Sequence, residues 1–396
     1  MNKEKDYKKI NLMYSFIIIC YVICEGFFGY GFMSFIFKKG INLAKIGLLM
    51  GLTNFAIMLF DYPSGNIADK YGRKKICSSG FIIYGIGLII FGFSNNFALF
   101  LISGIVRAFG SSLISGTPEA WYLDELSKIN KFSYKDKFLP IIRGIGLFFG
   151  SVSGIMAGKV SEINISLPIY IGGIIMIISG VIIGILFVEN YGNREGNLIK
   201  IINKNSVNFF RNSKMRILSV FEVLKTVMFT IFILLWQIFA TKVIGLSHSK
   251  LGYFYTAMLL LMSLSSFFSR YLMKKLNKIT VTILGLFFVS FGLIIFIYSN
   301  KNIYLFVLGF VIFEFSLGIV NTSYFTWVYD YISEEVRATY SSALNSVRGF
   351  SGFVMSVFLG KVIQDLGYNI GWIIALVSTL ISIIWLLKIQ KNDKNF

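Results

Sequence analysis

Residues 61–75 read DYPSGNIADKYGRKK and form a short polar loop between two long apolar runs. The core of the loop is a G-x-x-x-D-x-x-G-R-K pattern made by Gly65, Asp69, Gly72, Arg73 and Lys74. The first glycine lets a neighbouring helix approach closely, and the second permits a tight turn. The aspartate can accept backbone N–H bonds at a helix N-terminus, where the helix dipole favours negative charge. The loop therefore predicts two helices joined by a tight, basic turn.

The composition excludes water-soluble proteins. Of 396 residues, 56% are hydrophobic and 14% are charged, and the mean hydropathy is +0.72. A soluble domain carries about 25% charged residues. The formal net charge of +19 fits contact with anionic lipid headgroups. No basic stretch carries a nucleic-acid recognition motif, so we expect no nucleic-acid partner.

Twelve apolar runs are long enough to cross a bilayer, which takes about 20 residues. They lie at 11–37, 44–68, 75–93, 97–123, 138–158, 165–188, 217–241, 251–271, 279–299, 302–329, 338–360 and 367–388. The longest polar stretch, 189–216, separates the sixth run from the seventh. The sequence thus predicts an all-α membrane protein with a six-helix bundle at 1–188, a cytoplasmic linker at 189–216, and a second bundle at 217–396.

The distribution of Lys and Arg sets the expected orientation. With the N-terminus inside, the inner segments hold roughly three times as many Lys and Arg as the outer loops. We therefore expect a multi-pass protein of the cell membrane with both termini in the cytoplasm.

The two halves resemble each other. TPEAWYLDEL at 117–126 aligns with SYFTWVYDYI at 323–332, which pairs Trp121 with Trp327 and Asp124 with Asp330. Parallel repeats related about the membrane normal are a known transporter design, with the substrate site between the halves. The repeat predicts two pseudo-symmetric bundles.

The loop at 61–75 resembles the signature loop of the major facilitator superfamily, which lies between the second and third helices. The fourth run, RAFGSSLISGTPEAWYLD at 107–124, is similar to that of many bacterial members, especially exporters of drugs or metabolites. The resemblance implies two bundles around a central cavity that opens alternately to either side. It also implies that the loop locks the halves together on the cytoplasmic side. The second-half loop at 270–278 is degenerate, so we expect only the first copy to act as a gate.

A row of glycines marks one face of the fifth run. Gly146, Gly150, Gly154 and Gly158 recur every four residues. Small residues at this spacing indicate close helix packing.

Charged residues inside apolar runs are the candidate site, because each costs at least about 2.5–3.5 kcal/mol on insertion scales. The five candidates for a proton and substrate cavity are Glu25, Arg107, Glu222, Lys225 and Glu314. They lie on the first, fourth, seventh and tenth helices, which the family resemblance implies line the cavity. Our hypothesis is that Glu25 and Glu314 carry protons, while Arg107 sets their proton affinity or binds anionic parts of the substrate.

Simpler interpretations stay open for these charges. A static buried ion pair would also explain the acids and the arginine. Glu222 and Lys225 are three residues apart on one helix face and can neutralise each other.

A cytoplasmic gate is the second candidate site. Its residues are Asp61, Gly65, Asp69, Gly72, Arg73, Lys74 and Glu119. Asp61 and Glu119 lie near the cytoplasmic ends of their predicted helices and could pair with Arg143 or Arg348. For Lys74, a role in membrane topology alone is favoured.

The predicted function is secondary active transport of a small solute by alternating access, most simply proton-coupled efflux of amphipathic drugs or metabolites. The alternative is proton-coupled import of a polar solute such as a sugar, nucleoside or small acid. A non-transporting sensor or a membrane enzyme is a remote third. No G-x-x-x-x-G-K-[ST] motif is present and His248 is the only histidine, so we expect no enzyme activity, cofactor or metal. The expected partners are the lipid bilayer, the solute and protons, and we expect a monomer.

Overall fold

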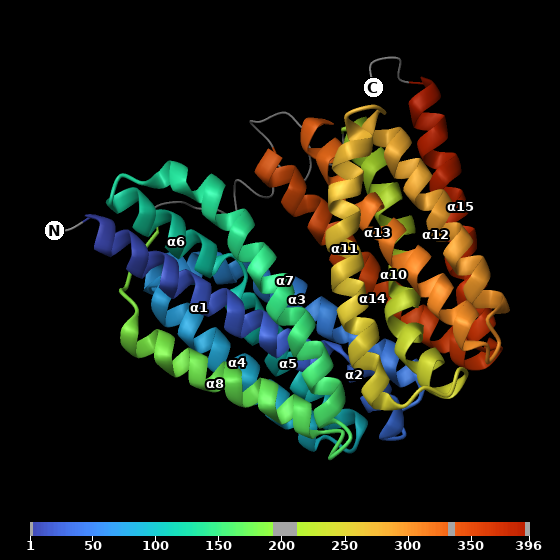
Figure 1. The fold of residues 1–396 in the computed structure, drawn as a ribbon, viewed down its shortest axis with the longest axis horizontal. Coiled ribbons are helices and arrows are strands. Elements are labelled where there is room, and N and C mark those ends of the chain that lie inside the picture. The colour runs from blue at the N-terminus through green and yellow to red at the C-terminus, as the bar shows by residue number, and fades with distance from the viewer. Residues whose placement is uncertain (1–2, 193–211, 332–336, 393–396) are drawn as a thin grey trace. The chain divides into compact units, whose positions relative to one another are not determined.

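The computed structural model describes residues 3–192, 212–331 and 337–392, and within them every regular element is helical (Figure 1). The first-half helices are α1 (Lys3–Gly29), α2 (Phe32–Lys38), α3 (Leu43–Tyr71), α4 (Arg73–Phe93), α5 (Phe97–Ile114), α6 (Thr117–Lys128), α7 (Lys135–Val160) and α8 (Leu167–Leu186). The second-half helices are α10 (Ser213–Lys242), α11 (Leu251–Met273), α12 (Lys278–Tyr298), α13 (Ile303–Tyr331), α14 (Arg337–Leu366) and α15 (Tyr368–Asn392). Short 3-10 turns, η1 (Phe132–Tyr134) and η2 (His248–Lys250), precede α7 and α11.

Twelve helical spans among the described residues are long and apolar enough to cross a membrane, which confirms the predicted all-α membrane fold. Two of the predicted spans are each built from two helices. The first is divided at Tyr30 and Gly31 into α1 and α2. The fourth, expected to run unbroken over 97–123, is divided between α5 and α6.

The break in the fourth span has a local cause. Gly116 has φ +71°, a left-handed conformation that glycine adopts without a Cβ clash. Pro118 then lies at the start of α6, where its missing N–H leaves no helical hydrogen bond unmade. The S-G-T-P sequence at 115–118 thus turns the chain between two helices.

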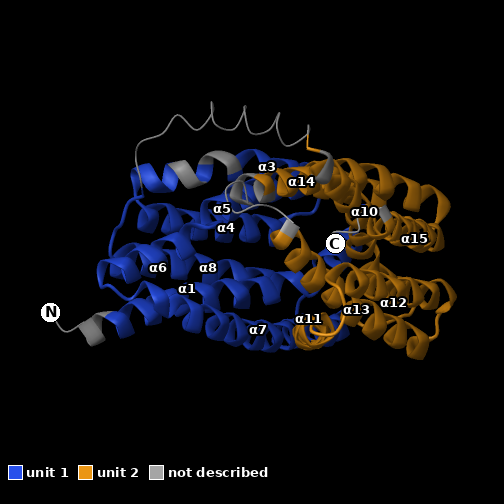
Figure 2. Cartoon of the chain, turned by 90° about the horizontal axis from the view of Figure 1, so that it is seen from above, with its two compact units in different colours: residues 1–41, 52–196, 248–256 blue, residues 42–51, 197–247, 257–396 orange. Residues whose placement is uncertain are grey.

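The chain divides into two compact units, coloured separately in Figure 2. Unit 1 contains residues 1–41, 52–196 and 248–256, and unit 2 contains 42–51, 197–247 and 257–396. Unit 1 therefore includes the start of α11 from the second half of the sequence, and unit 2 includes the start of α3 from the first half. Residues 193–211 of the predicted linker lie outside the described residues, and the domain boundaries drawn from the sequence stay a prediction.

Unit 1 is held together by close approaches at glycines. Helix α4 packs against α5 and α8, and α1 packs against α7 and α8. A Cβ at Gly110 of α5 would lie 2.5 Å from the backbone nitrogen of Tyr84 on α4. A Cβ at Gly85 would lie 2.6 Å from the carbonyl oxygen of Gly173 on α8. Larger residues at these positions would push the helices apart.

The predicted glycine row on α7 packs as expected, and it does so against two different helices. Gly146 faces Ile18 and Val22 of α1 at ordinary contact distance. Further along, a Cβ at Gly252 of α11 would lie only 2.3 Å from the carbonyl oxygen of Gly154. The start of α11 therefore seats on the α7 glycines inside unit 1.

Unit 2 has an aromatic core. Helix α12 packs against α13 and α15, while α10 packs against α14 and α15. Rings of α10, α12 and α13 meet with centroids 4.4–6.5 Å apart: Phe232, Trp236, Phe296, Phe310 and Phe313. Because these rings are almost fully buried, they position the helices that carry the charged residues described below.

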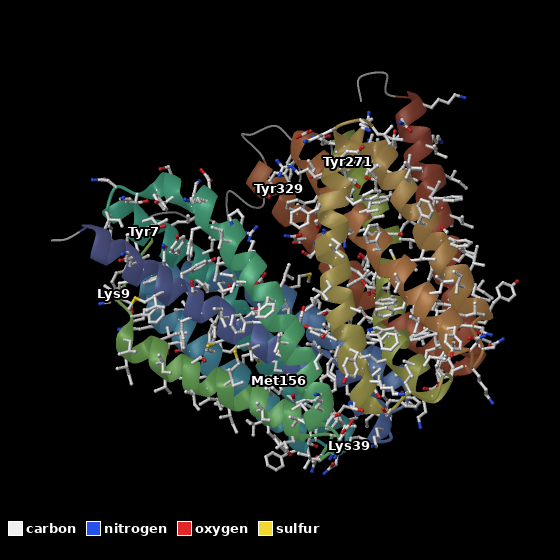
Figure 3. All side chains as sticks on the ribbon, in the orientation of Figure 1. Tyr7, Lys9, Lys39, Met156, Tyr271 and Tyr329 are labelled. Atoms are coloured by element: carbon white, nitrogen blue, oxygen red, sulfur yellow. The ribbon has the colours of Figure 1, made fainter. Side chains whose placement is uncertain are left out.

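Large apolar side chains also cover the outer surface, as expected for contact with lipid. Phe148, Phe267 and Phe287 are each more than 60% exposed. Figure 3 places Tyr7 and Lys9 near one end of α1 and Lys39 near the end of α2. The long apolar stretch of unit 1 thus has basic residues at both ends.

Candidate functional site

Glu25 of α1 lies at a helix junction in unit 1. The Tyr84 hydroxyl of α4 donates a hydrogen bond to Glu25 Oε1. The Tyr255 hydroxyl of α11 reaches the Glu25 backbone carbonyl at 3.4 Å. Tyr84 was not among the predicted site residues, because one tyrosine in an apolar run gives no sequence signal.

Arg107 of α5 lies beside this pair, in an aromatic surround. Its guanidinium carbon is 4.1 Å from the centroid of Phe28 and 5.7 Å from those of Tyr84 and Phe91. Such contacts stabilise a cation without neutralising it. The buried Nε and Nη1 atoms have no hydrogen-bond partner in the described part of the chain. The structure thus places Glu25 and Arg107 next to the same residue, Tyr84, which bonds the acid and has its ring beside the guanidinium.

Glu222 of α10 binds two cations in unit 2. Its carboxylate is 3.3 Å from Lys225 Nζ and 2.8 Å from Arg348 Nη2 of α14. Arg348 Nε also donates to Glu222 Oε2 at 3.2 Å, so the contact is bidentate. Glu222 is only 1% exposed. The mutual neutralisation expected for Glu222 and Lys225 is therefore incomplete, because a second cation shares the carboxylate.

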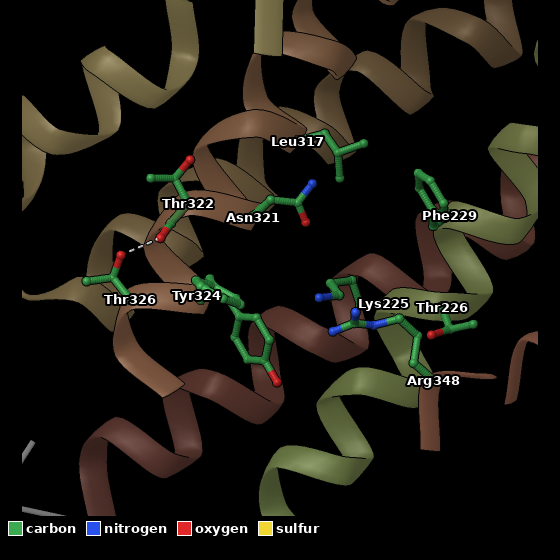
Figure 4. A pocket seen from close by; sticks show the side chains of 10 residues that line it. Lys225, Thr226, Phe229, Leu317, Asn321, Thr322, Tyr324, Thr326 and Arg348 are labelled. Atoms are coloured by element: carbon green, nitrogen blue, oxygen red, sulfur yellow. Dashed lines mark hydrogen bonds between the residues drawn. The ribbon is translucent and has the colours of Figure 1, made fainter. Parts of the chain in front are cut away.

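The cavity beside this cluster has a volume of about 580 Å³ (Figure 4). Helices α10, α13 and α14 supply its walls. Lys225, Arg348 and Asn321 contribute polar groups, while Phe229 and Leu317 contribute apolar surface. Cavities of about 300–1,000 Å³ suit small organic ligands.

Glu314 of α13 is a buried carboxylic acid. It is 1% exposed, and neither carboxylate oxygen has a hydrogen bond within the described residues. Leu317 and Asn321, three and seven residues further along α13, line the cavity, so Glu314 shares their helix face.

Arg73 organises the signature loop in unit 1. Its guanidinium bonds Asp69 Oδ1 through Nε at 3.0 Å and through Nη2 at 2.9 Å. Nη1 bonds Asp124 Oδ2 at 2.5 Å and the Ala120 carbonyl at 2.9 Å. Arg73 is itself 8% exposed. Arg73 thus connects the α3–α4 turn to α6 through hydrogen bonds and ion pairs.

A third carboxylate, that of Glu189, contacts the start of α4 on the other side of the turn. Glu189 Oε1 accepts a hydrogen bond from the backbone N–H of Lys74 at the start of α4, at 2.8 Å. The sequence predicts such a contact for Asp69, whereas the described contacts of Asp69 are with Arg73. Gly72 has φ +107°, and a Cβ there would lie 2.5 Å from the Glu189 carboxyl carbon. The glycine is therefore required by both backbone and space.

The other predicted gate residues are less tightly held. Glu119 pairs with Arg143 at 3.7 Å, and both side chains are largely exposed. Asp61 is exposed near the middle of α3, and its backbone carbonyl accepts a hydrogen bond from Ser64 at 2.8 Å. Gly65 lies within α3, and its surroundings are outside what the structure describes.

The second half keeps one counterpart of the Arg73–Asp124 pair. Lys278 at the start of α12 forms an ion pair with Asp330 of α13. Asp330 is the residue that the internal repeat aligns with Asp124. The degenerate second loop has therefore lost its acid and its glycine, but it retains a basic residue bound to the aligned aspartate.

Comparison with known proteins places these features in a family. The model of the Major Facilitator Superfamily matches residues 14–356. The chain belongs to the major facilitator superfamily. Membership establishes a membrane transporter rather than an enzyme. Within the described residues, no group of three or more His, Cys, Asp or Glu side chains could hold a metal ion.

Relatives within the superfamily are distant. The chain is 24% identical over 243 residues to YxaM of Bacillus subtilis, an uncharacterized MFS-type transporter, and the match spans 59% of each protein. It is 22% identical over 219 residues to Multidrug resistance protein 2 of the same organism, across 54% of each. It is 21% identical over 140 residues to the quinolone resistance protein NorA of Staphylococcus aureus, across 35% of each.

Solved superfamily structures share the fold. The nucleoside transporter NupG superposes with a TM-score of 0.82 at 15% identity, across 96% of this chain and 99% of NupG. A bacterial homologue of the lysosomal transporter Spinster, in an inward-facing state, superposes at 0.70 with 15% identity, across 98% and 95% of the two chains. At these identities the likeness concerns the fold alone.

Proposed function

We propose that this transporter exports amphipathic organic solutes across the cell membrane in exchange for protons. It works by alternating access as a monomer with both termini in the cytoplasm. The observation that carries the coupling is the Glu25–Tyr84–Arg107 cluster, in which a carboxylate with a neutral donor lies next to an incompletely bonded arginine.

The proposed proton step uses only these side chains. With a proton on Glu25, the Tyr84 hydroxyl bonds the acid and Arg107 lies against the ring of Phe28. When the proton leaves, the carboxylate becomes an anion, and Arg107 is the cation near enough to act on it. A charge pair formed in this way would draw α5 toward α1. Proton loss and helix movement are thereby linked, which is what exchange requires.

Efflux is favoured over uptake by sequence similarity. Two of the relatives are named for resistance to drugs, and the fourth-span pattern is typical of exporters. Glu314 is the proposed second proton carrier, because it is a buried carboxylate on the helix face that lines the unit 2 cavity.

The signature loop is the proposed gate on the cytoplasmic side. The contacts of Arg73 with Asp69 and Asp124, and of Glu189 with the start of α4, make the loop of unit 1 rigid. A rigid loop can transmit movement of its helices as a body. Exposed Glu119 and Arg143 are suited to making and breaking a pair during the cycle.

The test uses inverted membrane vesicles, which expose the cytoplasmic side of the protein. Energised vesicles should accumulate a panel of amphipathic dyes and antibiotics, and dissipating the pH gradient should stop the accumulation. Glu25→Gln should abolish gradient-driven accumulation, while Glu25→Asp retains part of it. Unchanged pH dependence in the glutamine variant would defeat the coupling mechanism. Uptake of sugars or nucleosides by right-side-out vesicles, without dye accumulation in inverted ones, would favour the import alternative.

A further inference from the structure

The charged cluster of unit 2 carries an excess of positive charge. Within the part of the chain that the structure describes, Lys225 and Arg348 share a single carboxylate, that of Glu222. Counting formal charges, two cations and one anion leave an excess of one positive charge. Uncompensated charge within a spanning segment costs at least about 2.5–3.5 kcal/mol on insertion scales. The arrangement therefore favours an anionic partner.

The cations also face an accessible space. Both line the 580 Å³ cavity, and Figure 4 shows the two side chains next to each other in its wall. The side chain of Arg348 is 48% exposed, although its partner Glu222 is 1% exposed. Arg348 has five N–H donors, of which Nε and Nη2 bond Glu222 and Nη1 bonds Asn345 at 3.3 Å. Two of the five N–H groups of Arg348 therefore have no hydrogen bond among the described residues.

A neutral donor of the same wall is unsatisfied. The hydroxyl of Thr226 is buried and has no hydrogen-bond partner within the described residues. Thr226 lines the cavity directly beside Lys225 in the sequence. The covered oxygen places a polar atom behind this part of the wall, and Lys225 and Arg348 are the groups that can bind a ligand there.

The remaining walls are apolar and aromatic. Phe229, Leu317, Phe325 and the ring of Tyr324 surround the polar groups. Tyr324 is already occupied by a cation, since Lys225 Nζ lies 4.3 Å from its ring centroid. A ligand amine would therefore meet two positive charges and an occupied ring, whereas an acid with an apolar body would fit every wall.

We propose that this cavity binds amphipathic organic anions, with a carboxylate or similar acid group on Lys225 and Arg348 and an apolar body against Phe229 and Leu317. This assignment deepens the proposed transport function and rests on it for the movement of the ligand. Binding at the cavity itself is measured separately from transport. The same chemistry occurs in a soluble organic acid and in an anionic lipid, and the experiment distinguishes the two.

Binding is measured by calorimetry on the full-length protein in phosphatidylcholine nanodiscs. Three probes of matched shape are used: 2-naphthoate, neutral 2-naphthamide and cationic 2-naphthylmethylammonium. We expect the anion to bind at least about tenfold more tightly than the amide, as one charge-assisted hydrogen bond provides. Equal binding of anion and amide, or preference for the ammonium, would overturn the proposal.

Removing a cation and removing the Glu222 charge should change the affinity for naphthoate in opposite directions. Lys225→Gln and Arg348→Gln each leave one cation with Glu222, so each should fold and should weaken naphthoate about tenfold. Glu222→Gln should tighten naphthoate, because both cations become available to it. Lys361→Gln, an exposed change on the same helix as Arg348, is the matched control. Cation variants that bind naphthoate as the control does would refute the subsite.

Two further arms identify the source of the anion and separate the proposals. Displacement of naphthoate by phosphatidylglycerol nanodiscs would assign the anion chemistry to lipid, and undiminished binding would assign it to a soluble acid. Naphthoate binding without gradient-driven transport of any probe would uphold the subsite and defeat the efflux proposal. Transport of cationic dyes by a protein that does not bind naphthoate would uphold the efflux proposal and defeat the subsite.

Discussion

The side chain of Arg73 joins the α3–α4 turn to α6, so Arg73→Gln should destabilise the protein measurably. The arginine is 8% exposed and bonds two carboxylates and one carbonyl. Hydrogen bonds to charged groups contribute about 1.5–3 kcal/mol each. Asp69 and Asp124 are 35% and 42% exposed, so water recovers part of the loss. We expect the free energy of unfolding to fall by about 2–3 kcal/mol.

A double-mutant cycle isolates the pair that bridges the two helices. Arg73→Gln, Asp124→Asn and the double variant are unfolded by denaturant in detergent micelles, with far-UV circular dichroism as the readout. The coupling energy should be about 1–2 kcal/mol, because the two side chains are in direct contact. Lys74→Gln is the matched control, since it removes a neighbouring positive charge. A loss for Arg73→Gln no larger than for the control, or zero coupling, would refute this account of the loop.

Three further changes test packing and burial. Gly252→Ala places a methyl group 2.3 Å from the Gly154 carbonyl oxygen, so it should separate α11 from α7 and lower the melting temperature; an unchanged melting temperature would show that this contact is not rigid. Gly72→Ala should cost about 1–3 kcal/mol in unfolding free energy, since a side chain would be strained at φ +107° and would clash with Glu189. Glu314→Gln should leave the protein equally or more stable, because an unpartnered buried carboxylate is replaced by a neutral group; a large destabilisation would reveal a partner for the acid.

Much of the first-half loop was predictable from local sequence. Gly72 was expected to allow a tight turn, and it does so at positive φ. The spacing of Asp69 and Arg73 places them one helical turn apart, close enough to bond. The role of Glu189 was not predictable, because Glu189 lies 115 residues from Lys74, whose backbone N–H donates the hydrogen bond to it.

The candidate site divides in the same way. Insertion cost alone singles out Glu25, Arg107 and Glu222 as residues that need a reason to be in the membrane. It cannot reveal that Tyr84 bonds Glu25, or that Arg348 turns an expected neutral pair into a cluster with excess positive charge. Those contacts join separate helices, and their rotation about the helix axes is set by packing.

The amino-acid sequence by itself determined the membrane, the twelve spans and the superfamily, because hydrocarbon thickness imposes a length and an apolar composition that any spanning helix must show. Tertiary structure alone decided which charges share a partner and which stay alone. Among the described residues Glu222 acquired two cations and Glu314 none, although both are single carboxylates in apolar helices. The physical reason is that a charge interacts over a few ångströms in space, and only the packing of helices distant in sequence brings groups that close.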